Sequence, residues 1–123
     1  MVERTGILGY TASIAAFSEG GPWLASLLTE LAANRRTLAE RIGEVLPGAG
    51  YRQPQASYLA WLDLRALPWG DDPAAELVDR SKVALGSGPA FGRQGAGFAR
   101  LNFGCSAETL DEGLSRLAAA ARA

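Results

Sequence analysis

Apolar residues recur at helical spacing in the first part of the chain. Residues 5–19 are rich in alanine and carry several larger apolar side chains, which predicts a short helix. Two glycines at 20–21 interrupt it, and Pro22 suits the first turn of a second helix, where a missing N–H costs nothing. One apolar stripe runs along that second helix, with Asn34 off the stripe and Pro47 at its end. The stripe comprises Leu24, Leu27, Leu28, Leu31, Leu38, Ile42 and Val45.

The middle of the chain alternates short apolar runs with turn residues. Residues 56–64 are apolar on both alternating faces, which predicts a buried strand. Asp72 is a good N-cap and Pro73 a good first helical residue, so a helix is predicted from there to about Lys82. Residues 83–85 predict a further short strand.

A last strand and a last helix complete the pattern. Residues 98–103 alternate, and successive residues of a strand point to opposite faces. One face carries Ala99, Leu101 and Phe103, and the other carries Phe98, Arg100 and Asn102. Ser106 caps the final helix, whose inner stripe is Leu110, Leu114, Leu117 and Ala121. This order of elements predicts an α/β or α+β layered domain, in which helices precede and cover a small sheet of about three strands.

Composition narrows the classes of function. The chain has 123 residues, enough for one domain, with 48% apolar and 20% charged residues. Its net charge of −1 argues against nucleic-acid binding, and its apolar runs are too short to span a membrane. No signal peptide is expected after Met1. A single cysteine, Cys105, excludes an intrachain disulfide and fits a reducing compartment, so we expect a cytoplasmic protein.

Two residue types are scarce in a way that limits the chemistry. The sequence contains no histidine, which excludes Ser-His and Cys-His nucleophile pairs and histidine metal sites. Lys82 is the one lysine, so a Schiff base has no other residue to use. Its place near a helix C-terminus favours an ordinary solvated lysine.

Arg100 is the strongest candidate for chemistry. It lies in mid-strand, where arginine is not preferred, and a guanidinium fixed on a strand can grip a carboxylate through two parallel hydrogen bonds. From spacing alone, an arginine on a solvated sheet face remains the more frequent explanation. Acid pairs at 71–72 and 111–112 begin helices and are interpreted as capping. Cys105 has no partner base and is interpreted as a small, partly buried residue.

The glycine-rich loop at 86–97 invites comparison with phosphate-binding loops. It lacks a Gly-Lys-Ser/Thr sequence, and it leads into a strand instead of opening a helix, so phosphate binding is disfavoured. Two other hypotheses remain open. The loop needs unusual backbone angles, or it is a mobile loop at the edge of a site on a neighbouring domain.

The segment from Gly88 to Phe103 resembles the C-terminal signature of pyridoxal-phosphate (PLP) enzymes of the class I/II aminotransferase fold (fold type I). It combines a Phe-Gly loop, a Gly-x-Gly-Phe lead-in and then Arg-Leu-Asn-Phe. It is most similar to the cystathionine β-lyase (C–S lyase) branch. Further agreement in order comes from Gly20-Gly21-Pro22-Trp23-Leu24, Tyr58-Leu-Ala-Trp61-Leu-Asp63, Asp72-Pro73 and Leu110-x-Glu112-x-Leu114-x-x-Leu117.

This resemblance implies a small domain that closes over an amino-acid substrate in a two-domain enzyme. Arg100 is the position that would bind the substrate α-carboxylate, with Phe91, Asn102 and Tyr58 as candidates to line the site. The family's chemistry is β-elimination or amino transfer, with PLP as electron sink.

The same resemblance implies that most of the catalytic apparatus is absent. Residues 1–21 would be the remnant of an interdomain helix and 22–123 the small domain, while the large PLP-binding domain with its Schiff-base lysine is missing. We therefore expect no PLP on this chain, no activity alone, and self-association through exposed apolar surface. The alternatives are a stand-alone, non-catalytic interaction module that keeps the fold, or a small domain that uses Arg100 to bind carboxylates.

Overall fold

The computed structural model describes residues 6–122, which fall into two compact units that divide after Ala32. The first unit holds α1 (Ile7–Glu19) and the first turns of α2 (Gly21–Val45). Gly20 ends α1, and its N–H donates to Ala16 O at 3.1 Å. The two helices predicted at the start of the chain are therefore present, although residue 5 lies outside the described residues.

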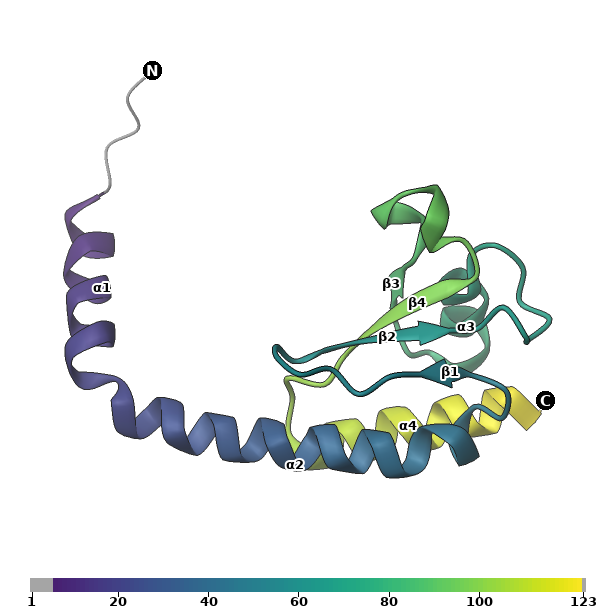
Figure 1. The fold of residues 1–123 in the computed structure, drawn as a ribbon, viewed down its shortest axis with the longest axis horizontal. Helices are drawn as coiled ribbons and strands as arrows, with labels where there is room; N and C mark the ends of the chain where they lie inside the picture. The colour runs from purple at the N-terminus through teal and green to yellow at the C-terminus, as the bar shows by residue number, and fades with distance from the viewer. Residues whose placement is uncertain (1–5, 123) are drawn as a thin grey trace, which may run out of the picture. The chain divides into compact units, whose positions relative to one another are not determined.

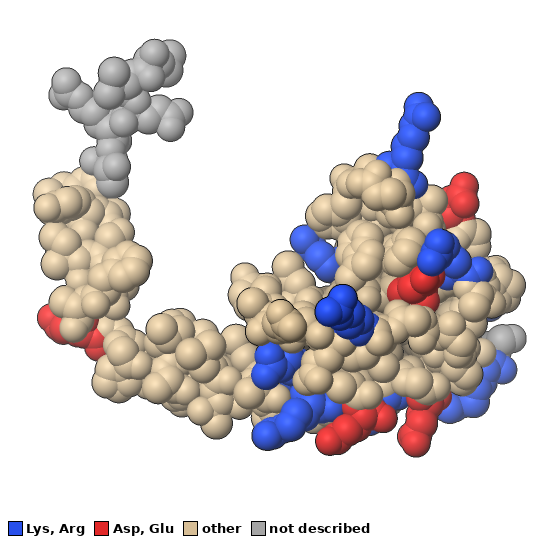
Figure 2. Space-filling view, in the orientation of Figure 1, with Lys and Arg blue, Asp and Glu red and all other residues tan. Residues whose placement is uncertain are grey.

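The helix α1 is apolar all around and buries none of its residues. Its large side chains are exposed, with Phe17 reaching 94% of its full accessible surface. Glu19 is its one charged residue, and its surface is almost entirely tan in Figure 2. The apolar stripe predicted along α2 is buried only in its second half, where Leu38 and Ile42 join the core. Leu24 and Leu28 are exposed instead.

The second unit contains a four-stranded antiparallel sheet in the order β1-β2-β4-β3 (Figure 1). The prediction of about three strands missed one short edge strand. The helices α3 and α4 begin where predicted, at Pro73 and just after Ser106. The bounds are β1 Gly50–Tyr51, β2 Leu59–Asp63, α3 Pro73–Ser81, β3 Gly86–Ser87, β4 Phe98–Asn102 and α4 Ala107–Arg122.

Helices cover one face of this sheet and leave the other open. Side chains from that covered face share one buried cluster with residues of α2, α3 and α4. The covered face consists of Ala60, Leu62, Ala99, Leu101 and Phe103, as the alternation in 98–103 predicts. The open face carries the other set of side chains, so the strand predicted to be buried on both faces is covered on one only. The domain is thus an α/β layer, as predicted.

The prediction of a strand at 83–85 is wrong by a few residues, because the observed strand β3 begins at Gly86. Lys82 ends α3 in the left-handed conformation, with a φ of 57°, and pairing with β4 begins only at Gly86. A Cβ on Gly86 would lie 3.3 Å from the Cβ of Arg100, so glycine eases the approach of the two strands. The short strand β1 had no sequence signal because two residues cannot show alternation.

Asn34 was placed off the apolar stripe, yet it is 5% exposed. Its side-chain amide donates to Phe103 O at 3.0 Å and to Cys105 O at 2.7 Å. Both carbonyls belong to the turn between β4 and α4, so this buried amide fixes that turn against α2. Within residues 6–122, no helix is long and apolar enough to cross a membrane.

Candidate functional site on the open sheet face

Arg100 lies at the centre of the uncovered face, in mid-β4. The register pairs it with Trp61 on β2 and with Gly86 on β3. Its guanidinium carbon is 4.8 Å from the centre of the Phe91 ring. Among residues 6–122, no acidic side chain forms an ion pair with Arg100. Arg100 is half-buried on a strand, and its guanidinium has no carboxylate partner in the part of the chain that is described.

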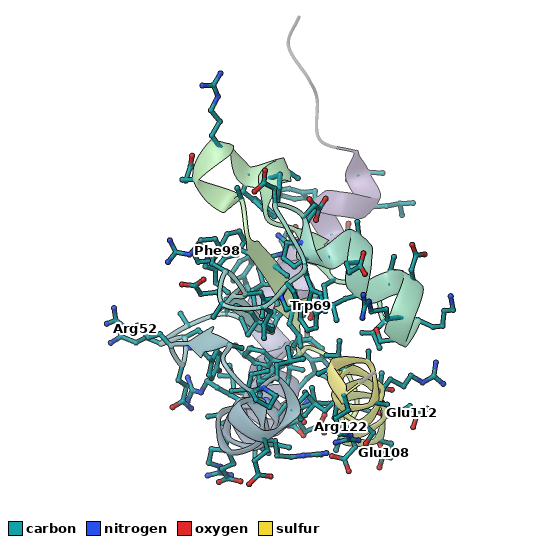
Figure 3. The ribbon with its side chains drawn as sticks, turned by 90° about the vertical axis from the view of Figure 1, so that its right-hand side faces the viewer. Arg52, Trp69, Phe98, Glu108, Glu112 and Arg122 are labelled. Carbon is teal, nitrogen blue, oxygen red and sulfur yellow. The ribbon has the colours of Figure 1, made fainter. Side chains whose placement is uncertain are left out.

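Three aromatic rings pack against one another on this face, and one of them, Phe91, also contacts Arg100. Trp61 meets the Phe91 ring edge-on, with centroids 5.5 Å apart and planes at 83°. On its other side Trp61 stacks on Phe98 at 5.6 Å and 17°. Figure 3 shows Phe98 on the side of β4 away from α3. Contacts of this geometry between aromatic rings are favourable beyond the area they bury.

Arg65 lies over Phe98, the ring at the other end of the stack, and, unlike Arg100 in the described part of the chain, it has an acidic partner. Its guanidinium carbon lies 4.8 Å from the Phe98 centroid. It also donates through Nε and Nη2 to the two carboxylate oxygens of Asp63, at 2.8 and 2.6 Å. These hydrogen bonds lower the pKa of the Asp63 carboxyl. Arg65 is thus already paired, whereas Arg100 has no acidic partner within residues 6–122.

The glycine-rich loop that carries Phe91 is compactly folded. Two short 3-10 turns, Pro89–Phe91 and Arg93–Gly95, lie between β3 and β4. Gly88 and Gly95 press together so closely that a Cβ on either would collide with the other's carbonyl oxygen. Gly92 has a φ of 115°, which favours glycine. Unusual backbone angles, one of the two open hypotheses, therefore explain Gly92 and Gly97, whereas close packing of the backbone explains Gly88 and Gly95.

The remaining candidates divide into two groups. Phe91 contacts Arg100, whereas Asn102 and Tyr58 lie together against Gly104. Asn102 Oδ1 accepts a hydrogen bond from Gly104 N at 2.8 Å, so its carbonyl oxygen serves the local turn. Tyr58 is about half exposed just before β2. All four side chains belong to the strands or loops of the open face, but only Phe91 contacts the guanidinium.

Other residues considered from the sequence have structural partners. Lys82 Nζ donates to Asp79 O at 2.7 Å. Cys105 borders an apolar groove of about 390 Å³ between α4 and residues 83–85, and burial raises the pKa of its thiol. Within residues 6–122, no cluster of acidic or cysteine side chains could hold a metal ion.

The acid pairs do not cap helices through their side chains as predicted. Asp72 Oδ2 accepts from Ser87 Oγ at 2.8 Å instead of from the first turn of α3. Asp111 pairs with Arg41 of α2, and Glu112 with Arg116 one turn along α4. In Figure 3, Glu112 lies on the outer side of α4. Ion pairs therefore hold Asp111 and Glu112, whereas Asp72 accepts a hydrogen bond from a hydroxyl group.

Trp61 also belongs to the open face, although the sequence did not single it out as a site candidate. Trp61 lies opposite Arg100 and keeps 39% of its surface exposed. This placement depends on the register between β2 and β4, and no local sequence pattern specifies that register.

Comparison with known proteins confirms the resemblance noted in the sequence. No family model matches the chain. The protein MalY of Escherichia coli K12 is 40% identical over 118 residues, covering 95% of this chain and 30% of MalY. Cystathionine beta-lyase PatB of Bacillus subtilis 168 is 39% identical over 125 residues, covering 97% of this chain and 32% of PatB.

The fold agrees with the same group of proteins. A solved structure of a PLP-dependent beta-cystathionase homologue from Corynebacterium diphtheriae superposes with a TM-score of 0.94 at 35% identity. That superposition covers 98% of this chain and 32% of the other. The chain is thus similar in sequence and fold to one part of PLP-dependent C–S lyases, and it spans about a third of the length of the relatives it matches.

Proposed function

We propose that this chain is the substrate-binding small domain of a PLP-dependent C–S lyase of fold type I. The chain matches about a third of the length of such enzymes. The activity would be that of a cystathionine β-lyase, with an aminotransferase as the alternative within the same fold. The observation that carries this proposal is Arg100, a strand-held guanidinium with no acidic partner among residues 6–122.

Arg100 would bind the α-carboxylate of an amino acid. A guanidinium offers parallel N–H donors that match the two oxygens of a carboxylate. Phe91 lies against the guanidinium and Trp61 against Phe91, and in the complete enzyme these rings would shield the contact from water on one side and so strengthen it. A substrate held at its carboxylate loses rotational freedom, so its reacting bonds can be aligned for catalysis elsewhere in the enzyme. Tyr58 and Asn102 would border the same face.

Residues 6–122 offer no site at which PLP would form its bond to a lysine. The cofactor would need a lysine for its aldehyde, and Lys82 is the chain's one lysine. The ammonium group of Lys82 donates a hydrogen bond to the backbone carbonyl of Asp79, at the end of α3. PLP supplies an electron sink where it is bound. In this account PLP is held by the larger part of the enzyme, so the chain is inactive alone. The complete enzyme would be a cytoplasmic protein.

The helix α1 would be the surface on which that larger part docks. We assign residues 1–21 to an interdomain segment and 22–123 to the small domain. Uncovered, the exposed side chains of Ile7, Leu8 and Phe17 are expected to drive self-association of the isolated chain. Analytical ultracentrifugation checks this. Dimers or larger species at high concentration are expected, and a strictly monomeric mass would contradict it.

A graft tests the proposed function directly. The segment of PatB that matches this chain is replaced by the chain itself, so that the rest of PatB supplies the PLP lysine. We expect the graft to release pyruvate from L-cystathionine, at a rate well above that of either part alone. A folded graft that binds PLP but forms no pyruvate would count against the proposal.

The apolar surface of α1 also favours a second candidate, a stand-alone interaction module. Such a module would need the fold and α1 but not Arg100. Substitution of Arg100 therefore separates the two functions, because only the carboxylate-binding domain loses activity with it.

A further inference from the structure

Two arginines on the open face lie over phenylalanine rings at the same distance but have different partners. Arg65 is held both by Phe98 and by two hydrogen bonds to Asp63. Arg100 has the Phe91 ring at 4.8 Å and no acidic partner among residues 6–122. The ring of Phe91 is therefore the main restraint on the Arg100 guanidinium beyond its own strand.

Phe91 is itself fixed from two sides. Its backbone N–H donates to Gly88 O at 2.9 Å, which closes the 3-10 turn that carries it. Its ring meets the edge of Trp61, the residue directly opposite Arg100 in the sheet. The Phe91 ring thus contacts both of the other side chains, whose backbone positions are set by the sheet, while the glycine-rich loop sets its own.

We propose that Phe91 is a positioning residue, which holds the Arg100 guanidinium in the pose that receives a carboxylate. An aromatic face attracts a cation through its quadrupole and takes up none of the N–H donors that a carboxylate needs. An acidic partner, such as Asp63 provides for Arg65, would occupy those same donors. This inference rests on the proposed function of Arg100 and assigns a task to the residue beneath it.

The test follows the side-chain Nε–H signal of Arg100 by NMR in the ¹⁵N-labelled chain. L-alanine is the probe, and L-alaninamide, which has no carboxylate, is the matched control ligand. Phe91→Leu removes the ring but keeps an apolar side chain, and Phe91→Tyr keeps the ring. Phe98→Leu is the control for a ring on the same face that contacts Arg65 instead.

Phe91→Leu is expected to move the Arg100 Nε–H signal, because the ring current is lost, and to weaken L-alanine binding about two- to fivefold. Phe91→Tyr and Phe98→Leu should leave the affinity within twofold of the unmodified chain. Amide spectra of the variants establish that each remains folded, as expected for a ring that is about half exposed.

The outcomes separate this inference from the function on which it rests. Equal L-alanine affinity in Phe91→Leu and the unmodified chain would overturn the positioning role alone. The same holds if Phe98→Leu weakens binding as much as Phe91→Leu does. If L-alanine does not shift the Arg100 Nε–H signal of the unmodified chain, the proposed function itself is contradicted, whatever the effect of Phe91→Leu.

Discussion

Gly88→Ala is expected to lower the free energy of unfolding of the chain by about 3 kcal/mol, at the upper end of the usual cost of overpacking. A Cβ at this position would lie 2.1 Å from Gly95 O and 2.3 Å from Phe98 O. Both atoms are backbone, so no side chain can rotate away to make room. A loss of this size is a large fraction of the stability of a small domain.

The helix α4 offers a matched control for this substitution. Gly113 lies in mid-helix, with no atom within 4 Å of an added Cβ. Gly113→Ala is therefore expected to raise the free energy of unfolding by about 0.5–1 kcal/mol, since alanine has the better helix propensity. Urea unfolding of both variants measures the two effects. Equal stability of Gly88→Ala and the unmodified chain would show that the loop is not packed as described.

Arg100→Gln should have the largest effect on activity. In the graft with PatB it is expected to lower kcat/KM about 10- to 100-fold, because a charged hydrogen bond contributes about 1.5–3 kcal/mol. Much of the loss should appear in KM, since the carboxylate contact is already present in the bound substrate. Steady-state kinetics of pyruvate release measures both constants.

Arg65→Gln is the control for this kinetic prediction. Arg65 lies on the same open face and on a similar ring, but it is paired with Asp63. Its loss should change kcat/KM by less than twofold. If Arg65→Gln and Arg100→Gln reduce kcat/KM equally, a general loss of positive charge explains the result and Arg100 has no special role.

The sequence was sufficient to predict on which face of its strand Arg100 lies. Period-two alternation in 98–103 separated Arg100 and Asn102 from the buried Ala99 and Leu101, as observed. The resemblance around Gly88 to Phe103 predicted the fold that the solved structures confirm. These features are local, so a local pattern could reveal them.

Features that depend on long-range contacts could not be predicted in the same way. Asn34 is buried because two carbonyls about 70 positions away accept from its amide. The contact of Phe91 with Arg100 depends on two 3-10 turns, which no periodicity specifies. Trp61 faces Arg100 only through the register of β2 with β4.

The apolar character of the open face is consistent with a covered surface in the complete enzyme. Residues 56–64 are apolar on both alternating faces, a pattern typical of strands that are covered on both sides. Helices cover one side here, and Trp61 remains 39% exposed on the other. We infer that the larger part of the enzyme closes over this face, which would enclose Arg100 with its substrate.

The most direct test of the central claim is the response of Arg100 to a carboxylate in the chain itself. L-alanine is titrated into the ¹⁵N-labelled chain while the side-chain Nε–H signals of Arg100 and Arg65 are followed. The account predicts a saturable shift at Arg100, little change at Arg65, which is already paired with Asp63, and no shift at either with L-alaninamide. Equal shifts at both arginines, or none at Arg100, would contradict the claim that this chain carries the carboxylate-binding arginine of a PLP-dependent enzyme.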